Sequence, residues 1–327
     1  MRCVVLGPSA LALRHAAALH ESGWEICALI SMPPALRPEN SADIDGFGRQ
    51  YQIPYHELEE INTPQAVRCI QGYAPDYIFS AWPKLLESRI LAIPQFFCVG
   101  THPTPLPFNR GRHPLHWMVV LGITDTVMSF IRMDEGIDTG NVLLRVPFRV
   151  APEDTISDAM DNMLAAAYLG TRLLCQRLPL DPLMKGTRQD HEVANYWRRR
   201  TPHDVTLDVR MSVSAVLRTV RSFSAPYPYA TLMFRSHLIK IAKASRSTLI
   251  MPRDRIARLE PGRILRVSPP TMTVKVDDGL VDLECMGAIP PELLEVKYIH
   301  PPSKYLMDRE GSRTMDDAAA SGRQLVT

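Results

Sequence analysis

The chain has 327 residues, of which 46% are hydrophobic and 22% are charged, and its formal net charge at pH 7 is +2. This length favours two domains, and the composition is that of an ordinary globular protein, which excludes the disordered and fibrous classes. Because Met1 and Arg2 lead directly into a strand-like segment and no apolar run approaches the roughly 18 residues of a membrane helix, we expect a cytoplasmic protein without a membrane partner.

Up to about residue 180, short apolar strands alternate with helical patterns, which predicts a parallel sheet covered by helices on both faces. We predict strands at 3–6, 26–30, 77–80 and 96–101, with helices or helical turns at 10–21, 64–73 and 85–91. The segment 102–114 contains four prolines, which remove amide donors and exclude both a helix and a central strand, so it must be a loop. A helix to residue 121, strands near 127–132 and 142–150, and a helix from 154 to about 176 complete a first domain at residues 1–184.

The later part of the chain has a different texture. Residues after 178 are rich in Pro, Arg and Thr, and we assign 185–206 to a linker. A helix near 212–222 and short strands at 230–234, 238–242, 263–267 and 271–276 predict a second domain at 207–301, which is a small β-barrel-like unit or sheet. Residues 302–327 are expected to form a tail.

Nicotinamide, disulfide and metal sites are disfavoured by the sequence. The segment Gly7-Pro8-Ser9 lacks the second and third glycines of the dinucleotide fingerprint, and Pro8 removes an amide. The six cysteines lie far apart with mostly apolar neighbours, which indicates reduced, buried thiols. His113 and His116 have no nearby Cys or carboxylate to complete a ligand set, so we expect no metal.

Charge is unevenly distributed along the chain. Residues 185–266 hold 17 Lys or Arg against 6 Asp or Glu, a local charge of +11. This asymmetry suits a phosphate-bearing partner of the second half, and an ordinary solvated basic face explains it equally well.

Two segments carry side chains suited to acyl transfer. The segment 100–111 places His102 at the end of a predicted strand, and the segment 133–140 contains Asp138 in an Asp-Glu-Gly-x-Asp-x-Gly pattern. A lone histidine at a strand end is more often structural than catalytic, but both loops are expected at the carboxyl edge of one sheet, where open α/β folds bind ligands. A carboxylate beside an imidazole suits acylation of an amine, because one group removes the amine proton while the other stabilises the oxyanion.

Both segments resemble the folate-dependent formyltransferase family, which includes methionyl-tRNA, glycinamide ribonucleotide and amino-sugar formyltransferases. That family carries an Asn-x-His-x-Ser-Leu-Leu-Pro-x-x-Arg-Gly loop and, about three dozen residues later, an Asp-x-Gly-x-Asp-x-Gly loop, and His102 and Asp138 have this separation. The resemblance covers nearly the whole chain. It implies an α/β fold, in which a Rossmann-like parallel-sheet formyltransferase domain is followed by a small β-rich, OB-like C-terminal domain.

The resemblance also implies the co-substrate, 10-formyltetrahydrofolate, and a set of site residues. Carried over by position, the catalytic pair is His102 and Asp138, and the substrate-binding residues are Thr104, Asn109 and Arg110. The residues predicted to bind the folate are Trp82, Lys84, Leu85, Leu86, Asp134 and Gly136. A flat heteroaromatic ring requires apolar walls and a few backbone hydrogen bonds, and a core position for Trp82 is an equal alternative.

One position departs from the family pattern. Gly100 replaces the asparagine that normally donates to the oxyanion, and losing such a donor costs on the order of 3 to 4 kcal/mol. Thr101, a backbone amide or a protonated His102 must substitute for it. Otherwise the chain is a slow enzyme or a binding relic.

Two further segments bear on the acceptor amine. Methionyl-tRNA formyltransferases carry a basic insertion after the second strand, whereas residues 31–52 here contain two arginines against three carboxylates and are poorly suited to phosphate. Residues 196–208 and 226–230 resemble the domain junction of bacterial amino-sugar nucleotide formyltransferases, although a solvated linker would look similar. We therefore expect a small-molecule partner, a nucleotide-linked amino sugar, rather than nucleic acid.

Other functions stay open on the sequence alone. Methionyl-tRNA and hydroxyornithine are alternative acceptors. A 10-formyltetrahydrofolate hydrolase is a third alternative, since an apolar residue replaces the same asparagine in the folate dehydrogenase that resembles this family. A non-catalytic folate-binding module is disfavoured by the presence of both His102 and Asp138. The sequence is also compatible with a homodimer.

Overall fold

A computed structural model describes residues 1–305 and separates the chain into two units, one of Met1–Arg200 and one that begins at Thr201. The segment 185–200, for which the sequence predicts a linker, is therefore part of the first unit. No helix within residues 1–305 combines the length and the apolarity needed to cross a bilayer.

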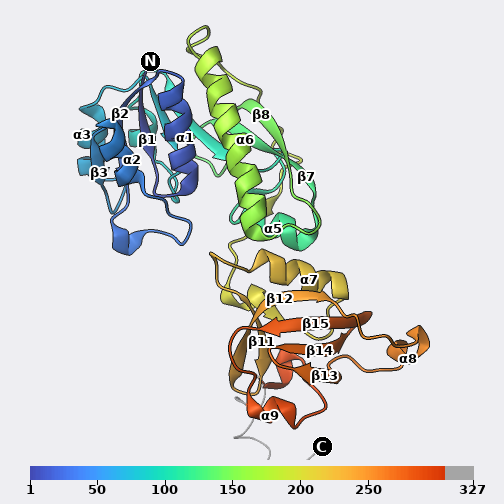
Figure 1. The fold of residues 1–327 in the computed structure, drawn as a ribbon. Coiled ribbons are helices and arrows are strands. Elements are labelled where there is room, and N and C mark those ends of the chain that lie inside the picture. Colours follow the sequence, from blue (N-terminus) through green and yellow to red (C-terminus); the bar gives the residue numbers. More distant parts are fainter. Residues whose placement is uncertain (306–327) are drawn as a thin grey trace, which may run out of the picture. The chain divides into compact units, whose positions relative to one another are not determined.

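The first unit is built on one mixed sheet of seven strands. In spatial order these are β3 (Tyr55–Glu57), β2 (Glu25–Ser31), β1 (Arg2–Leu6), β4 (Tyr77–Ser80), β5 (Phe97–His102), β7 (Asp125–Arg132) and β8 (Val142–Arg149). The strands from β3 to β5 pair in parallel, while β7 is antiparallel to both β5 and β8 (Figure 1). The predicted parallel sheet is confirmed for the four predicted strands β2, β1, β4 and β5, to which β3 is added at one edge and an antiparallel hairpin on the β5 side.

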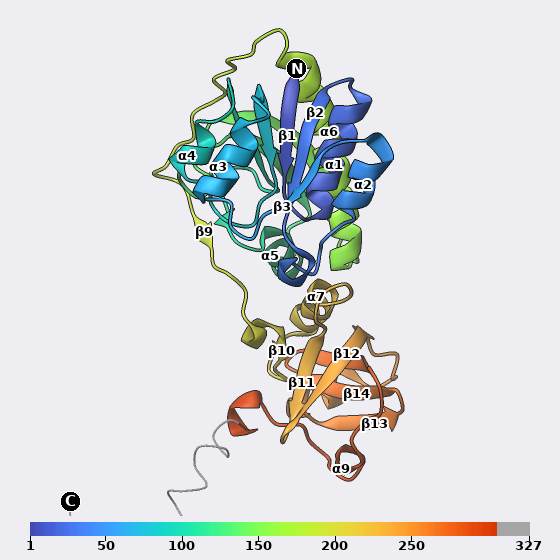
Figure 2. The same cartoon turned by 90° about the vertical axis from the view of Figure 1, so that its left-hand side faces the viewer.

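Helices cover both faces of this sheet. On one face lie α1 (Ala10–Glu21), α2 (Ile44–Tyr51) and α6 (Ile156–Arg177), and on the other lie α3 (Pro64–Gln71) and α4 (Ser88–Leu91) (Figure 2). Alternate strand residues divide between the two interfaces, so that Val5 packs toward α1 while Val4 packs toward α3. Strands that are buried on both faces require the near-continuous apolar runs seen in the sequence.

Two elements between residues 31 and 57 are absent from the prediction, namely α2 and β3. The helix α2 contains Gly46 and Gly48, which weaken a helical pattern, and β3 has only three residues. The apolar residues Ile44, Phe47 and Tyr51 of α2 do have helical spacing, but the helix spans only eight residues and two of them are glycines, while β3 is too short to show an alternation.

The second unit contains a six-stranded, mainly antiparallel sheet. Its strands in spatial order are β10 (Thr206–Leu207), β11 (Ala230–Phe234), β12 (His237–Arg246), β15 (Gly279–Cys285), β14 (Thr271–Val276) and β13 (Ile264–Ser268). Its helices are α7 (Val213–Ser222), α8 (Arg253–Ala257) and α9 (Pro291–Leu294). The predicted small β-rich domain is confirmed, with α7 close to its predicted position.

The predicted tail at 302–327 begins within the second unit. Tyr305 is 6% exposed, its hydroxyl accepts a hydrogen bond of 3.1 Å from the His300 amide, and its ring centroid lies 6.2 Å from that of Phe234. Tyr305 therefore belongs to the packed structure. The rest of the predicted tail, residues 306–327, lies outside the described residues.

Candidate active site

The strand β5 determines which side chains can meet beside His102. Successive strand residues point to opposite faces, so Gly100 and His102 share one face and Thr101 points to the other. The Thr101 hydroxyl lies 3.4 Å from Nε2 of His15, a buried residue of α1. Thr101 is therefore engaged on the far face and does not replace the missing asparagine.

His102 faces Asp138, as the sequence predicts. The His102 side chain is 6% exposed, and its Nδ1 lies 3.5 Å from Asp138 Oδ2. Its Nε2 lies 2.8 Å from the carbonyl oxygen of Asn109, and because a carbonyl only accepts, Nε2 must be the donor. Asp138 Oδ2 also accepts a hydrogen bond of 2.9 Å from the Gly111 amide. These contacts leave Nδ1 of His102 as the nitrogen that can exchange a proton beside Asp138.

The loop that carries Asp138 starts from the other end of β5. In the antiparallel β5–β7 pair, Arg132 lies opposite Val99 and Ser129 lies opposite His102. The Met133 amide accordingly donates to the Cys98 carbonyl at 2.9 Å. The expectation that both loops leave the carboxyl edge of the sheet is wrong for this loop, because the sequence does not reveal that β7 is antiparallel. The loop must run back along β5 for Asp138 to reach His102.

Internal hydrogen bonds and close backbone contacts shape this loop. Asp134 Oδ1 accepts hydrogen bonds from the Gly136 amide at 3.1 Å and from the Thr139 hydroxyl at 2.5 Å. A Cβ at Gly140 would lie 1.9 Å from the Arg132 carbonyl oxygen, so only glycine fits there. Asp134 and Gly136 thus form the turn, and their predicted contact with the folate stays a prediction.

Residues 185–200, which we call the strap, cross the two catalytic loops. Within the strap, β9 (Tyr196–Trp197) pairs in parallel with β6 (Arg110–Gly111), directly after the histidine loop. Near its start, Thr187 and Val142 exchange two backbone hydrogen bonds of 2.8 Å. The predicted linker is therefore an ordered part of the wall of the site. Its sequence has no hydrophobic periodicity from which this pairing could be predicted.

The residues predicted to bind substrate are largely occupied by protein contacts. Arg110 is 1% exposed, and its guanidinium donates to the strap. Thr104 is fully buried and donates to the Phe108 carbonyl at 2.8 Å. The Asn109 side chain accepts a hydrogen bond of 2.9 Å from Asn195. The structure presents neither Arg110 nor Thr104 to a ligand, and it assigns both to holding the loop.

The predicted folate residues separate into a buried and an exposed pair. Trp82 and Leu86 are 8% and 2% exposed and belong to the core cluster on the α3 face. Lys84 forms an ion pair with Glu60, and Leu85 is half exposed. Among the described residues, the buried Trp82 Nε1 has no hydrogen-bond partner. An apolar wall with an unsatisfied donor suits a flat heteroaromatic ring, so these residues fit a pterin, and their individual contacts with it stay predictions.

Met133 is a site residue that the sequence did not indicate. A Cβ built on Gly100 would lie 2.8 Å from Met133 Cγ and 3.0 Å from its Sδ. Met133 also packs against the cluster of Trp82 and against that of Leu106. Its side chain thus occupies, on the His102 face of β5, the space that an asparagine at position 100 would need. Only the tertiary structure brings the two positions together.

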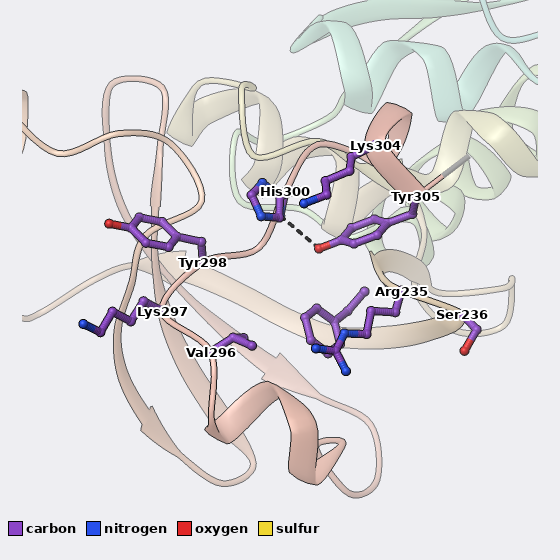
Figure 3. A pocket seen from close by; sticks show the side chains of 9 residues that line it. Arg235, Ser236, Val296, Lys297, Tyr298, His300, Lys304 and Tyr305 are labelled. Atoms are coloured by element: carbon purple, nitrogen blue, oxygen red, sulfur yellow. Dashed lines mark hydrogen bonds between the residues drawn. The ribbon is translucent and has the colours of Figure 1, made fainter. Parts of the chain in front are cut away.

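A separate pocket of about 630 Å³ lies in the second unit, and none of the predicted site residues lines it (Figure 3). Cationic and aromatic side chains dominate its lining, with Arg235, Lys297, Lys304, Phe234, Tyr298 and Tyr305 among them. In the part of the chain that the structure describes, no carboxylate belongs to the lining of this pocket. Within residues 1–305, no group of three or more His, Cys, Asp or Glu side chains could hold a metal ion.

Comparisons with known proteins agree with this architecture. The family described as Formyl transferase matches residues 1–172, and the family described as Formyl transferase, C-terminal domain, matches residues 200–308. The methionyl-tRNA formyltransferase of Desulforamulus reducens is 25% identical over 305 residues, which cover 90% of this chain and 93% of that protein.

Solved structures show the same fold at low sequence identity. An N-formyltransferase from Helicobacter canadensis, in complex with folinic acid and dTDP-3-aminofucose, has a TM-score of 0.61 at 13% identity, covering 87% of this chain and 99% of that one. HypX from Aquifex aeolicus also has a TM-score of 0.61, at 16% identity, covering 86% of this chain and 45% of that one.

Proposed function

Since the chain belongs to the formyl transferase family, whose members are enzymes that use 10-formyltetrahydrofolate, we propose that its acceptor is the amine of a nucleotide-linked amino sugar. In this proposal His102 and Asp138 carry the transfer. The acceptor nitrogen forms a bond to the formyl carbon while the bond from that carbon to the folate nitrogen breaks.

In this proposal each of the two side chains takes part in one proton transfer. The Asp138 carboxylate is the group that takes the proton from the attacking amine. Because Nε2 donates one proton to the Asn109 carbonyl, His102 must carry a second proton on Nδ1, 3.5 Å from Asp138 Oδ2, to stabilise the oxyanion and to protonate the leaving nitrogen. Asp138 then passes the proton taken from the amine to Nδ1. The acceptor amine loses one proton and the leaving folate nitrogen gains one, so the reaction needs no further reactant.

The observation that favours a sugar nucleotide over tRNA is the neutralised segment 31–52. Its arginines are both in ion pairs, Arg37 with Glu57 at 3.0 Å and Arg49 with Asp45. A segment whose two arginines are already paired with carboxylates has little positive charge left for an RNA backbone. A free, compact sugar nucleotide does not need such a basic grip.

Transfer to methionyl-tRNA is the second candidate. The sequence relatives at 25–28% identity are methionyl-tRNA formyltransferases. The cationic side chains that line the pocket in the second unit would also suit phosphate groups.

A panel assay separates these functions. The protein is incubated with 10-formyltetrahydrofolate and, in turn, amino-sugar nucleotides, charged initiator tRNA, hydroxyornithine or no acceptor, and formylated product and formate are quantified. We expect product with an amino-sugar nucleotide only. Formylation of methionyl-tRNA alone would overturn the sugar assignment, and formate release at the same rate without acceptor would show a hydrolase.

A further inference from the structure

We propose that Gln189 is a positioning residue for formyl transfer, because its side chain holds the Asp138 loop in the conformation that turns the carboxylate toward His102. The inference rests on the formyltransferase activity of the family and on no particular acceptor. Gln189 lies in the strap, far in sequence from both catalytic loops, and belongs to neither of their motifs.

Both ends of the Gln189 side chain are saturated with hydrogen bonds. Its Nε2 donates to the carbonyl oxygens of Asp138 at 2.8 Å and Gly140 at 2.6 Å. Its Oε1 accepts from Arg110 Nη2 at 2.7 Å and from Arg110 Nε at 3.3 Å. Carbonyl groups only accept hydrogen bonds and a guanidinium only donates them, so Gln189 Nε2 must face the two carbonyls and Oε1 must face Arg110. Gln189 is 4% exposed, which removes water as a substitute for these partners.

The Asp138 backbone needs such a contact. Its φ of 54° lies in the left-handed region, which a residue with a side chain adopts only when its surroundings stabilise it. The two carbonyls on either side of Thr139 converge on one Gln189 nitrogen, so the amide clamps the peptide that follows Asp138. The orientation of that peptide determines the backbone conformation of Asp138, and this conformation in turn sets the direction of the Asp138 side chain.

Arg110 supports the clamp from behind. Its other partners are neutral, namely the Tyr196 hydroxyl at 2.9 Å and His191 Nδ1 at 3.2 Å. A buried guanidinium that donates to Gln189 Oε1 polarises the amide and strengthens the hydrogen bonds on its other end. The arginine of the Arg110-Gly111 pair therefore acts on Asp138 through Gln189.

The variant Gln189→Glu tests the donor end alone. The introduced carboxylate gains a charged partner in Arg110, which keeps it ionised, but it presents an oxygen to the carbonyls of Asp138 and Gly140. We expect the wild-type circular dichroism spectrum, a fall in kcat on the order of tenfold or more and a KM for folate within about twofold. We also expect a changed ¹⁵N chemical shift for His102 Nδ1 at fixed pH.

Glu192→Gln is the matched control, because it makes the reverse carboxylate-to-amide exchange at an exposed position of the same strap and leaves both ends of Gln189 intact. Its kcat and His102 shift should equal those of wild type. A Gln189→Glu protein that keeps both the kcat and the shift would overturn the proposal. If Gln189→Glu does not fold, Gln189→Met, which removes both polar ends of the side chain, is measured instead. An unchanged ¹⁵N shift of His102 Nδ1 in that variant would overturn the proposal.

The nitrogen shift requires no acceptor. A wrong choice of acceptor therefore leaves this test unaffected, and kcat is measured with whichever acceptor the panel identifies, or as formate release.

Discussion

Among single residues, Asp138 is the one whose charge the proposed reaction would use most directly. Asp138→Asn keeps the shape of the side chain and an oxygen for the Gly111 amide, but it cannot take a proton from an amine. We expect kcat to fall on the order of 100-fold or more, while calorimetry with 5-formyltetrahydrofolate gives an unchanged affinity. Formylation near the wild-type rate would exclude Asp138 as the base.

The Gly100–Met133 contact gives a second prediction at this scale. Gly100→Asn alone must displace Met133, whose Cγ would lie 2.8 Å from the new Cβ, so we expect no gain in rate. Combined with Met133→Ala, the asparagine has room, and restored donation to the oxyanion should raise kcat by up to about 100-fold. Met133→Ala alone is the control, because it measures the effect on kcat of removing the Met133 side chain without adding the asparagine. A gain from Gly100→Asn alone would mean that Met133 moves aside at little cost.

The sequence identified the side chains whose chemistry is visible in their type, His102 and Asp138, and the structure brings these together. It assigned Arg110 to a ligand because a motif marks a residue as important without saying what it touches. Gln189 and Met133 could not be predicted, since each acts through a contact between segments that no local pattern relates.

At the scale of elements, the packing of α1 on α6 and β5 includes a buried histidine with a predictable pH dependence. His15 Nδ1 lies 2.8 Å from the Thr171 hydroxyl, and burial lowers the pKa of His15 from 6.5 to about 4. The unfolded chain binds this proton more readily, so the stability contributed by neutral His15 is complete above pH 6.5 and is lost as the pH falls toward 4.

His15→Gln removes this titration while keeping a donor and an acceptor. Urea unfolding at pH 7 and pH 5 should show that wild type loses about 2 kcal/mol more than the variant between the two values. Equal losses would show that burial does not lower the pKa of His15 in the folded protein.

Elements with a strong pattern were predictable and their relations were not. α6 was placed correctly because its apolar stripe is long and a capping box of Thr155 and Asp158 marks its start. The direction of β7 does not follow from its own residues, because side chains alternate between the two faces in the same way whether a strand pairs in parallel or antiparallel. The two-residue pairing of β6 with β9 is too short for any pattern.

For the molecule as a whole, the extent of the first unit can be tested by truncation. A fragment of residues 1–200 keeps the strap and should fold and bind 5-formyltetrahydrofolate with the affinity of the full chain. A fragment of residues 1–184 lacks β9, the partner of β6, and lacks Gln189 with its hydrogen bonds to Arg110 and Asp138. We expect it to melt at a lower temperature in circular dichroism and to bind folate more weakly. Equal behaviour of the two fragments would place the unit boundary at 184 instead.

The pairing of β6 with β9 also has a consequence during protein synthesis. Translation proceeds from the N-terminus, so His102 and Asp138 emerge from the ribosome well before Tyr196 and Trp197, which complete the wall beside them. A nascent chain therefore exposes both catalytic side chains before it can hold them in register. We therefore expect efficient formyl transfer only after the strap has left the ribosome and β9 has paired with β6.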